Sequence, residues 1–433
     1  MRRRRETIDC KLRWHDGWHN AVFSSWPGTH TEAQTYMNAT THQVRPLAEL
    51  PFYCHPIYLF LTVWALMLGS LIIQVSESTY PDSSMGVILF LVSLLALLAG
   101  VGAVRLANYA EKGSPISLAY RVDSRHLRRI NWIICIGIAS IVVFNSILMG
   151  PPPIIGFFGV PTLPYAEYGR FKQVLFPLAM ALFINSTVDE SRVRRWFWWF
   201  SSLGTLLAYV ARGPILITVS QVLILHSIRT AASKRTMYVR AFVVLAIALA
   251  AMDVIGNNRT AEDAFFVGMD IKNEFRGWPT AILWPVAYVS TPISNMCWIV
   301  NGAHFTEPSI SFLYQVLPSF WLPANPHEAT LSDSHIVDGV HTYLANYFLD
   351  FSWAGILGCN FAIGLAAGFA THRERISRKF MLSPILLSSI GFIFFWDYFT
   401  ALYTVLEFCV QALTQKLCVK PVGRARGAAS TQS

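Results

Sequence analysis

Residues 86 to 104 read GVILFLVSLLALLAGVGAV, a run of 19 residues without a charged side chain. At 1.5 Å rise per residue, a helix of that length crosses most of a roughly 30 Å hydrocarbon layer. Similarly apolar runs occupy 57–75, 131–149, 171–187, 196–211, 213–228, 241–255, 350–370, 381–397 and 399–417. The composition agrees, because a chain with 54% hydrophobic and 14% charged residues is too apolar for a soluble domain of this size. The sequence predicts an all-α polytopic membrane protein with about ten transmembrane helices.

The basic residues divide unevenly between the two sides of such a bundle. With the amino terminus inside, 28 of the 34 Lys and Arg residues fall on the inner side. Short cytoplasmic loops retain Lys and Arg, so both termini are predicted to be cytoplasmic. The net charge of +9 is therefore a topology signal, and we expect the lipid bilayer rather than nucleic acid as a partner. Six basic residues remain outside: Arg170, Lys172, Arg212, Arg259, Lys272 and Arg276.

This topology divides the chain into five parts. They are a basic cytosolic tail (1–55), seven transmembrane helices (56–255), a large external loop (256–349), three further transmembrane helices (350–417) and a second cytosolic tail (418–433). No apolar run precedes residue 57, so no cleavable signal peptide is expected. The external loop is too long for a simple connection and is rich in aromatic residues, which favours a packed cap with a cleft at the bilayer surface.

One stretch, 281–300, is apolar enough to be an eleventh span, but counting it would place eight basic residues of the last inner loop and tail outside. Pro285 and Pro292 lie within it and remove backbone donors. We therefore expect an interfacial or re-entrant segment that is broken at the prolines.

Arg212 lies in AYVARGPILITV (208–219), at the turn between two predicted helices that share almost no loop. Pro214 is typical of the first turn of a helix, whose amino terminus favours anions. A planar guanidinium at that point suits a phosphate or pyrophosphate. The alternative is that Arg212 reaches up to lipid headgroups without a chemical role.

Other polar residues have two readings each. Arg259 and Arg276 either bind an anion or pair with neighbouring carboxylates. The external histidines and acids include candidates for proton transfer near neutral pH, and their spacing matches no metal motif: His304, His327, His335, His341, Asp333, Asp338 and Asp350. Glu407 lies near the middle of a predicted span, where a carboxylate is either functional or a neutral structural group.

Three segments resemble the Wzy-type oligosaccharide repeat-unit polymerases, the O-antigen polymerases. They are ARGPIL (211–216), FLYQVLPSFWLPANP (312–326) and HTYLANYFLDFSWAGILGCNFAIGLAAGF (341–369). Members of that family often have a Ser/Gly-Arg-Gly turn in the first segment and a Tyr…Asp-Phe-Gly…Gly element in the third. Here Val210-Ala211 precede Arg212, and Ser352 stands where the family has glycine. The similarity covers residues 205–371 with loose motifs.

The resemblance implies an inverting, metal-independent glycosyltransferase of GT-C-like architecture, without a cofactor. Its substrates would be undecaprenyl-pyrophosphate-linked glycans at the outer leaflet, and its partners a chain-length regulator and a flippase of the same pathway. By the same resemblance, Arg212 and Arg276 stabilise the pyrophosphate, while His341 and Asp350 flank the acceptor hydroxyl. Further substrate contacts are expected from Arg259, Arg170, His335, Asp338 and Tyr343.

Two other functions fit parts of the pattern. An O-antigen ligase uses the same donor with another acceptor and also has a large outer loop with basic and His residues. A polysaccharide or lipid transporter would explain Glu407 and the interrupted stretch 281–300, but it predicts internal repeats and polar residues along several spans, which the sequence does not clearly show.

Overall fold

The computed structural model describes residues 41–43, 50–109, 119–160, 162, 169–230, 233–259, 269–302, 308–317, 327, 342–371, 380–394 and 401–421. Contacts divide the chain into Met1–Thr40, which lies outside those residues, and Thr41–Ser433, which holds every element given below. The predicted split of the second part into loop and helix regions is not visible in this division.

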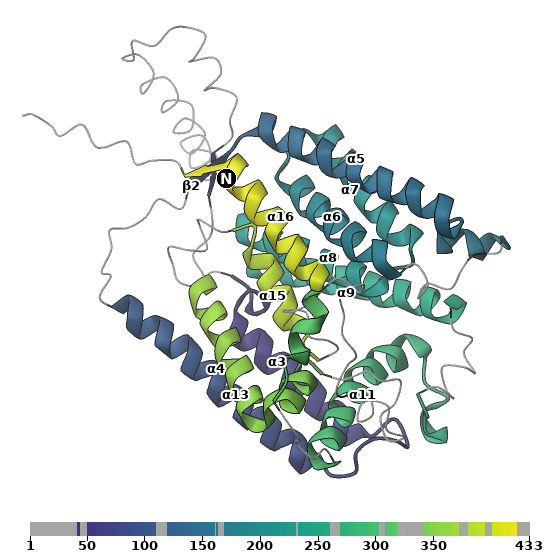
Figure 1. Ribbon diagram of the computed structural model, residues 1–433, viewed down its shortest axis with the longest axis vertical. Helices are drawn as coiled ribbons and strands as arrows, with labels where there is room; N and C mark the ends of the chain where they lie inside the picture. Colours follow the sequence, from purple (N-terminus) through teal and green to yellow (C-terminus); the bar gives the residue numbers. More distant parts are fainter. Residues whose placement is uncertain are drawn as a thin grey trace, which may run out of the picture. The chain divides into compact units, whose positions relative to one another are not determined.

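The described chain is mostly helical (Figure 1). The helices are α3 (Pro56–Ile73), α4 (Ser83–Tyr109), α5 (Ser124–Met149), α6 (Gly169–Val188), α7 (Arg192–Ala208), α8 (Arg212–Arg229), α9 (Lys234–Arg259), α11 (Thr280–Gly302), α13 (Leu344–Thr371), α15 (Ser383–Gly391) and α16 (Leu402–Cys418). Short 3-10 helices are η2 (Phe52–Cys54), η3 (Pro153–Phe158), η5 (Asn273–Phe275) and η6 (Ser311–Val316). The strands are β1 (Thr41–Gln43), β2 (Ala119–Val122) and β3 (Val419–Pro421).

Four of the described helices are long and apolar enough to cross a membrane: Pro56–Ile73, Ser83–Ala107, Ser124–Met149 and Leu344–Ala370. The all-α membrane class is therefore supported. Each predicted span overlaps a helix, but α15 has only 9 residues, so the count of ten stays a prediction.

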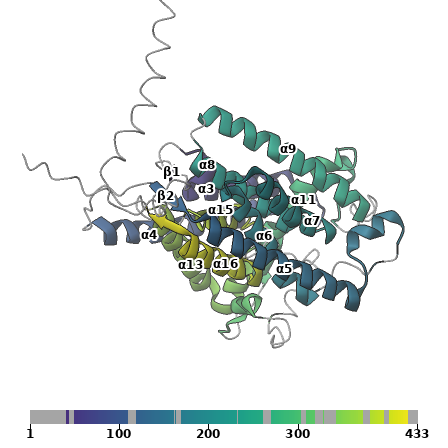
Figure 2. The same cartoon turned by 90° about the horizontal axis from the view of Figure 1, so that it is seen from above.

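The surface of the bundle is apolar and part of its interior is polar. Leu106, Ile147 and Phe242 are each more than 70% exposed. Asn131 and Asn185, by contrast, are fully buried between α5 and α6, where the Asn185 side chain donates to the Asn131 Oδ1 at 2.9 Å. Seen from above, α9 forms one margin of the bundle (Figure 2). This distribution suits a protein whose outer surface faces lipid.

A small antiparallel sheet, in the order β1-β2-β3, joins distant parts of the chain. Its central strand carries Tyr120, whose ring stacks on Phe380 at 4.1 Å and whose hydroxyl accepts a hydrogen bond from Arg229 Nε at 2.9 Å. The segments before α3, between α4 and α5, after α8, before α15 and after α16 therefore meet at one end, which we call the sheet end. These are the segments that the distribution of Lys and Arg assigned to one side.

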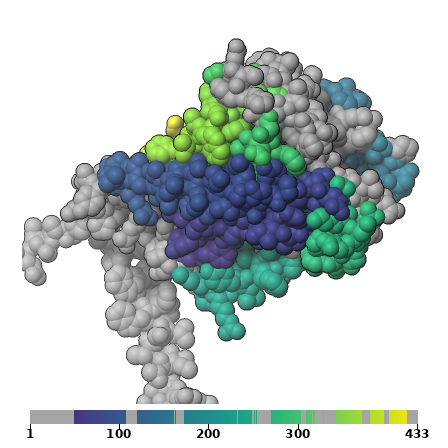
Figure 3. All heavy atoms as spheres, turned by 90° about the horizontal axis from the view of Figure 1, so that it is seen from below, coloured from purple at the N-terminus to yellow at the C-terminus, as the bar shows by residue number. Residues whose placement is uncertain are grey.

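Helices α4 and α13 pack against each other, with α4 in blue and α13 in light green (Figure 3). A Cβ atom at Gly364 would lie 2.2 Å from the Leu97 carbonyl oxygen, and one at Gly100 would lie 2.3 Å from the Phe361 carbonyl oxygen. A Cβ at Gly368 would lie 2.9 Å from Val104. Small residues at such contacts let transmembrane helices approach closely, so glycine is required at these three positions.

The predicted break within 281–300 is wrong. Helix α11 runs without interruption from Thr280 to Gly302, with Pro285 and Pro292 inside it. The two prolines are seven residues apart and lie on one helix face, so the two lost hydrogen bonds fall on the same side. Burial of twelve of its residues, Pro292 among them, stabilises the helix despite these losses.

Helix α11 lies beside the turn that connects α3 to α4. The Tyr80 N–H donates to Ser294 Oγ at 2.7 Å, and the Trp298 indole donates to the Ser78 carbonyl oxygen at 3.3 Å. The same turn pairs with residues before α11 through a bridge between Ser76 and Ile271. We call this region, opposite the sheet, the far end of the bundle.

The glycine contact predicts that Gly364→Ala lowers the stability of the protein, by about 1 to 3 kcal/mol, because the α4 backbone must move away. Gly358→Ala on the same helix is the matched control, because a Cβ there meets nothing within 4 Å. Alanine is also the better helix former, so this control should be neutral or stabilising. The midpoint of thermal unfolding in detergent measures both, and equal midpoints would contradict the proposed contact.

Candidate functional site

The carboxylate of Asp350, in the first part of α13, is fully buried and accepts hydrogen bonds from four groups. Its Oδ1 accepts from Ser311 Oγ at 2.8 Å and from Ser309 Oγ, and its Oδ2 accepts from the Phe312 N–H at 2.8 Å. The imidazole of His327 lies with Nε2 2.9 Å from the same Oδ1. These hydrogen bonds bring together the start of η6, the first part of α13 and His327.

The hydroxyl of Ser309 also lies 3.2 Å from His327 Nε2. In a Ser-His-Asp triad the two ring nitrogens face different partners, so that the ring carries a proton from one to the other. Here one nitrogen faces both Ser309 and Asp350. Ser309 therefore lacks the geometry of the nucleophile in such a triad. Its hydroxyl and the Asp350 carboxylate can instead orient the imidazole of His327, and a proton can pass between His327 and Asp350.

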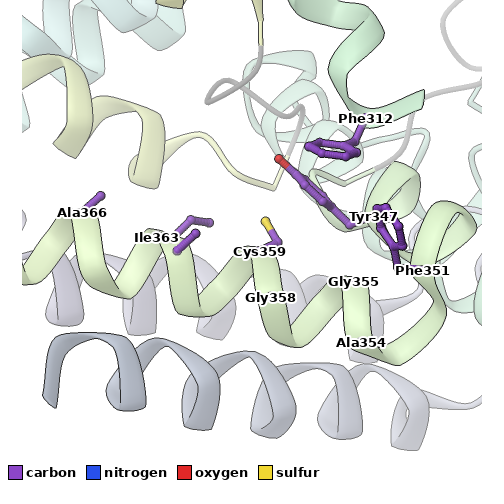
Figure 4. Close-up of a pocket in the computed structure, with 10 residues that line it drawn as sticks. Phe312, Tyr347, Phe351, Ala354, Gly355, Gly358, Cys359, Ile363 and Ala366 are labelled. Carbon is purple, nitrogen blue, oxygen red and sulfur yellow. The ribbon is translucent and has the colours of Figure 1, made fainter. Parts of the chain in front are cut away.

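An apolar groove of about 580 Å³ follows α13 (Figure 4). One of its lining residues, Phe312, donates its N–H to the Asp350 carboxylate. Aromatic rings of Phe312, Tyr347 and Phe351 line one end, and small residues from Ala354 to Ala366 line the rest. The ring centroids of Phe312 and Tyr347 are 4.9 Å apart. A groove with aromatic and small apolar walls accommodates a flexible hydrocarbon chain, and its aromatic end lies next to the polar group.

A kink in α13 creates this geometry. Ser352 has φ 56° and ψ −144°, a backbone conformation that only glycine adopts freely. The two parts of α13 then fold so closely that a Cβ at Gly355 would lie 1.9 Å from the Tyr347 carbonyl oxygen. The kink at Ser352 in the Asp-Phe-Ser…Gly element (350–355) therefore turns the segment with Asp350 away from the axis of the following helix.

The turn between α7 and α8 is strained in the same way. Val210 has φ 52°, which is an outlier for a β-branched residue. The Ala211 N–H donates to the Leu206 carbonyl at 3.0 Å and the Val210 N–H to the Leu207 carbonyl at 2.9 Å, as in a helix end that usually carries glycine. Helix α8 begins at Arg212, and because Arg229 lies at the sheet end, Arg212 begins the helix toward the far end.

The other predicted site residues fall into three groups. The backbones of Arg170, Arg212 and Arg259 lie in α6, α8 and α9, but their side chains are outside the described residues, as are His335, Asp338 and His341 entirely. Arg276 is exposed beside η5, and its Nε donates to the Ile271 carbonyl oxygen at 3.5 Å. Tyr343 is buried inside the bundle, and its hydroxyl donates to Asn360 Oδ1 at 2.5 Å; it is not among the residues that line the groove along α13.

Sequence reasoning selected Asp350 but did not select its partners. His327 was one of several external histidines, and nothing in its spacing distinguished it from the others. One signal was present: His327 directly follows FLYQVLPSFWLPANP, the segment of the resemblance whose first residue is Phe312. Among the residues that the structure describes, no group of three or more His, Cys, Asp or Glu side chains is placed to hold a metal ion.

Comparison with known proteins adds nothing further to this site. No protein family, no curated protein and no solved structure matches the chain.

The conformation of Ser352 predicts that Ser352→Gly stabilises the protein by about 1 kcal/mol, because glycine removes the strain of the Cβ atom. The gain is smaller than the full strain, since glycine also makes the unfolded chain more flexible. Ser352→Ala keeps the Cβ and removes only the hydroxyl, so it should bring no gain. Thermal unfolding of the three proteins measures the difference, and a Gly variant no more stable than the Ala variant would show that the kink is unstrained.

Proposed function

We propose that the protein polymerises undecaprenyl-pyrophosphate-linked oligosaccharide repeat units at the outer face of the bacterial cytoplasmic membrane. The observation that carries the proposal is the pairing of Asp350 and His327 at the aromatic end of an apolar groove. A lipid-linked glycan has the same two parts, a long hydrocarbon chain and a polar head that reacts. The resemblance to O-antigen polymerases in the segments around Arg212, Phe312 and Asp350 supports the same reading.

In the proposed reaction an acceptor sugar hydroxyl attacks the anomeric carbon of the donor glycan. A new bond forms between that oxygen and the anomeric carbon, and the bond from the anomeric carbon to the pyrophosphate oxygen breaks. The proton of the acceptor hydroxyl goes to the His327–Asp350 pair, and the electron pair leaves with the lipid pyrophosphate. Arg212, at the start of α8, stabilises the charge that develops on this leaving group.

We also propose ten membrane spans with both termini in the cytoplasm. Described segments that carry Arg121, Arg229 and Lys420 meet at the sheet end, which becomes the cytoplasmic side. The far end, with the start of α8 and the first part of α13, becomes the outer side, where lipid-linked repeat units are presented. Helix α11 then belongs to the outer cap, which agrees with its contacts to the turn at Ser78 and Tyr80.

The pair of Asp350 and His327 predicts that Asp350→Asn abolishes long polymer. The asparagine amide places an NH2 group where the carboxylate oxygen accepts hydrogen bonds, and it cannot take up a proton. The rate of polymerisation should therefore fall by about a hundredfold to ten-thousandfold. Surface polysaccharide from a deletion strain that carries the variant gene, separated by length on a gel, measures the effect. Tyr343→Phe is the control, because Tyr343 is buried away from the groove, and it should give normal chain lengths.

The same strain distinguishes the polymerase from the alternatives. Loss of the ladder with one attached repeat unit retained is the expected result. Loss of all attached polysaccharide would indicate a ligase, and accumulation of lipid-linked units on the inner leaflet would indicate a transporter. Full-length polymer with Asp350→Asn would remove this carboxylate from the mechanism.

Arg212 is tested by replacement with Lys and with Ala. If its planar fork binds pyrophosphate at two points, Arg212→Lys should fail nearly as badly as Arg212→Ala, because an ammonium group cannot reproduce the fork. The loss should be about a hundredfold in rate, equivalent to about 3 kcal/mol. Chain length is measured after membrane levels of each variant are shown to be normal. A Lys variant with full-length polymer would transfer the proposed role to Arg276 or Arg259.

A further inference from the structure

Glu407 lies in the middle of α16 and is fully buried. Its Oε2 accepts one hydrogen bond, from Gln221 Nε2 of α8 at 3.1 Å. Within the described part of the chain, its Oε1 has no hydrogen-bond partner. Among the residues that the structure describes, no Lys, Arg or His nitrogen lies within 4.0 Å of this carboxylate.

Two other buried carboxylates in the described chain, Asp350 and Asp189, have more hydrogen-bond donors around them. Asp350 accepts from four groups, as shown above. Asp189 lies 3.1 Å from the Arg194 guanidinium and also accepts from the Trp198 indole at 3.1 Å. A buried carboxylate without a compensating charge or several donors costs several kcal/mol. Among the buried carboxylates of the described residues, Glu407 lacks both, so its charge requires another compensating group.

Two amide oxygens beside Glu407 are also unpaired. Gln411 lies one turn further along α16, where residues four apart are neighbours on the helix surface. Its Nε2 donates to the Ala181 carbonyl oxygen of α6 at 2.9 Å. Among the described residues, neither the Oε1 of Gln411 nor the Oε1 of Gln221 has a hydrogen-bond partner. Both amide nitrogens are therefore engaged, and three buried oxygens from three side chains remain without a donor.

We propose that Glu407, Gln221 and Gln411 together bind a monovalent alkali cation such as sodium. Carboxylate and amide oxygens are the ligands that hard cations prefer. The single negative charge of the cluster matches a single positive charge. A proton on Glu407 would neutralise the carboxylate but satisfy only one of the two amide oxygens, and a water molecule would leave the charge uncompensated. A cation satisfies all three oxygens and the charge together.

The proposal is tested on the whole protein in detergent by thermal unfolding in sodium chloride, potassium chloride or choline chloride at equal ionic strength. A ligand that binds only the folded state stabilises it in proportion to the logarithm of its concentration. Sodium or potassium should therefore raise the unfolding temperature by about 2 °C or more above choline, with saturation. The better of the two ions identifies the preferred cation. Equal unfolding temperatures in all three salts, at pH 6 and at pH 8, would overturn the proposal.

Three variants locate the effect. Glu407→Gln removes the charge with little change in shape and should abolish the difference between the alkali salts and choline. Gln411→Leu removes one ligand and should raise the half-saturating cation concentration by about tenfold. Thr414→Val on the same helix is the matched control, because the Thr414 hydroxyl donates to the Val410 carbonyl at 2.9 Å outside the cluster, and it should keep the full response. A full response in Glu407→Gln would overturn the proposal even if the wild type responds.

Discussion

The close approach of α4 and α13 is the contact on which the proposed site depends. Gly100, Gly364 and Gly368 bring the two backbones together without side chains between them. In a bilayer no hydrophobic effect drives helices together, because lipid tails are as apolar as leucine, so tight packing and polar contacts have to do so. The same interface contains Asn360, whose amide donates to Ser93 of α4 at 3.1 Å. Because the long part of α13 is held against α4, the groove along α13 and the preceding segment with Asp350 are held in fixed positions.

Two residues near the proposed site have a strained backbone. Ser352 and Val210 both have positive φ values. Ser352 lies two residues after Asp350, and Val210 lies two residues before Arg212. A strained backbone persists only where the surrounding structure holds it, and such positions concentrate at functional sites. Neither residue is a glycine, so packing around the two turns must offset the cost of the backbone conformation.

The sequence predicted features that depend on composition and local pattern. Apolar runs predicted where the helices lie, and the distribution of Lys and Arg predicted which segments gather at one end, where Tyr120, Arg229 and Phe380 meet. It failed for α11, because the cost of two prolines was weighed without the burial that offsets it. It also failed to select His327, since the approach of this residue to Asp350 depends on how a long connection folds, and no helical or strand period constrains that path. Pairings of that kind are decided by tertiary structure alone.

Some buried polar groups in this bundle have all their hydrogen-bond partners and others do not, and we assign different roles to the two kinds. Asp350 is surrounded by donors, which holds its oxygens in fixed positions next to a groove. Glu407 accepts from one donor, and its second oxygen and two neighbouring amide oxygens have no donor among the described residues, so we propose that a cation completes the cluster. Gln221 belongs to α8, which begins at Arg212, and Glu407 belongs to α16, so a cation between them would tie these two helices together. Unpaired polar atoms in a membrane interior are costly enough that their retention requires a compensating interaction. Glu407, Gln221 and Gln411 are not among the residues that line the groove, so the proposed substrate does not supply that interaction.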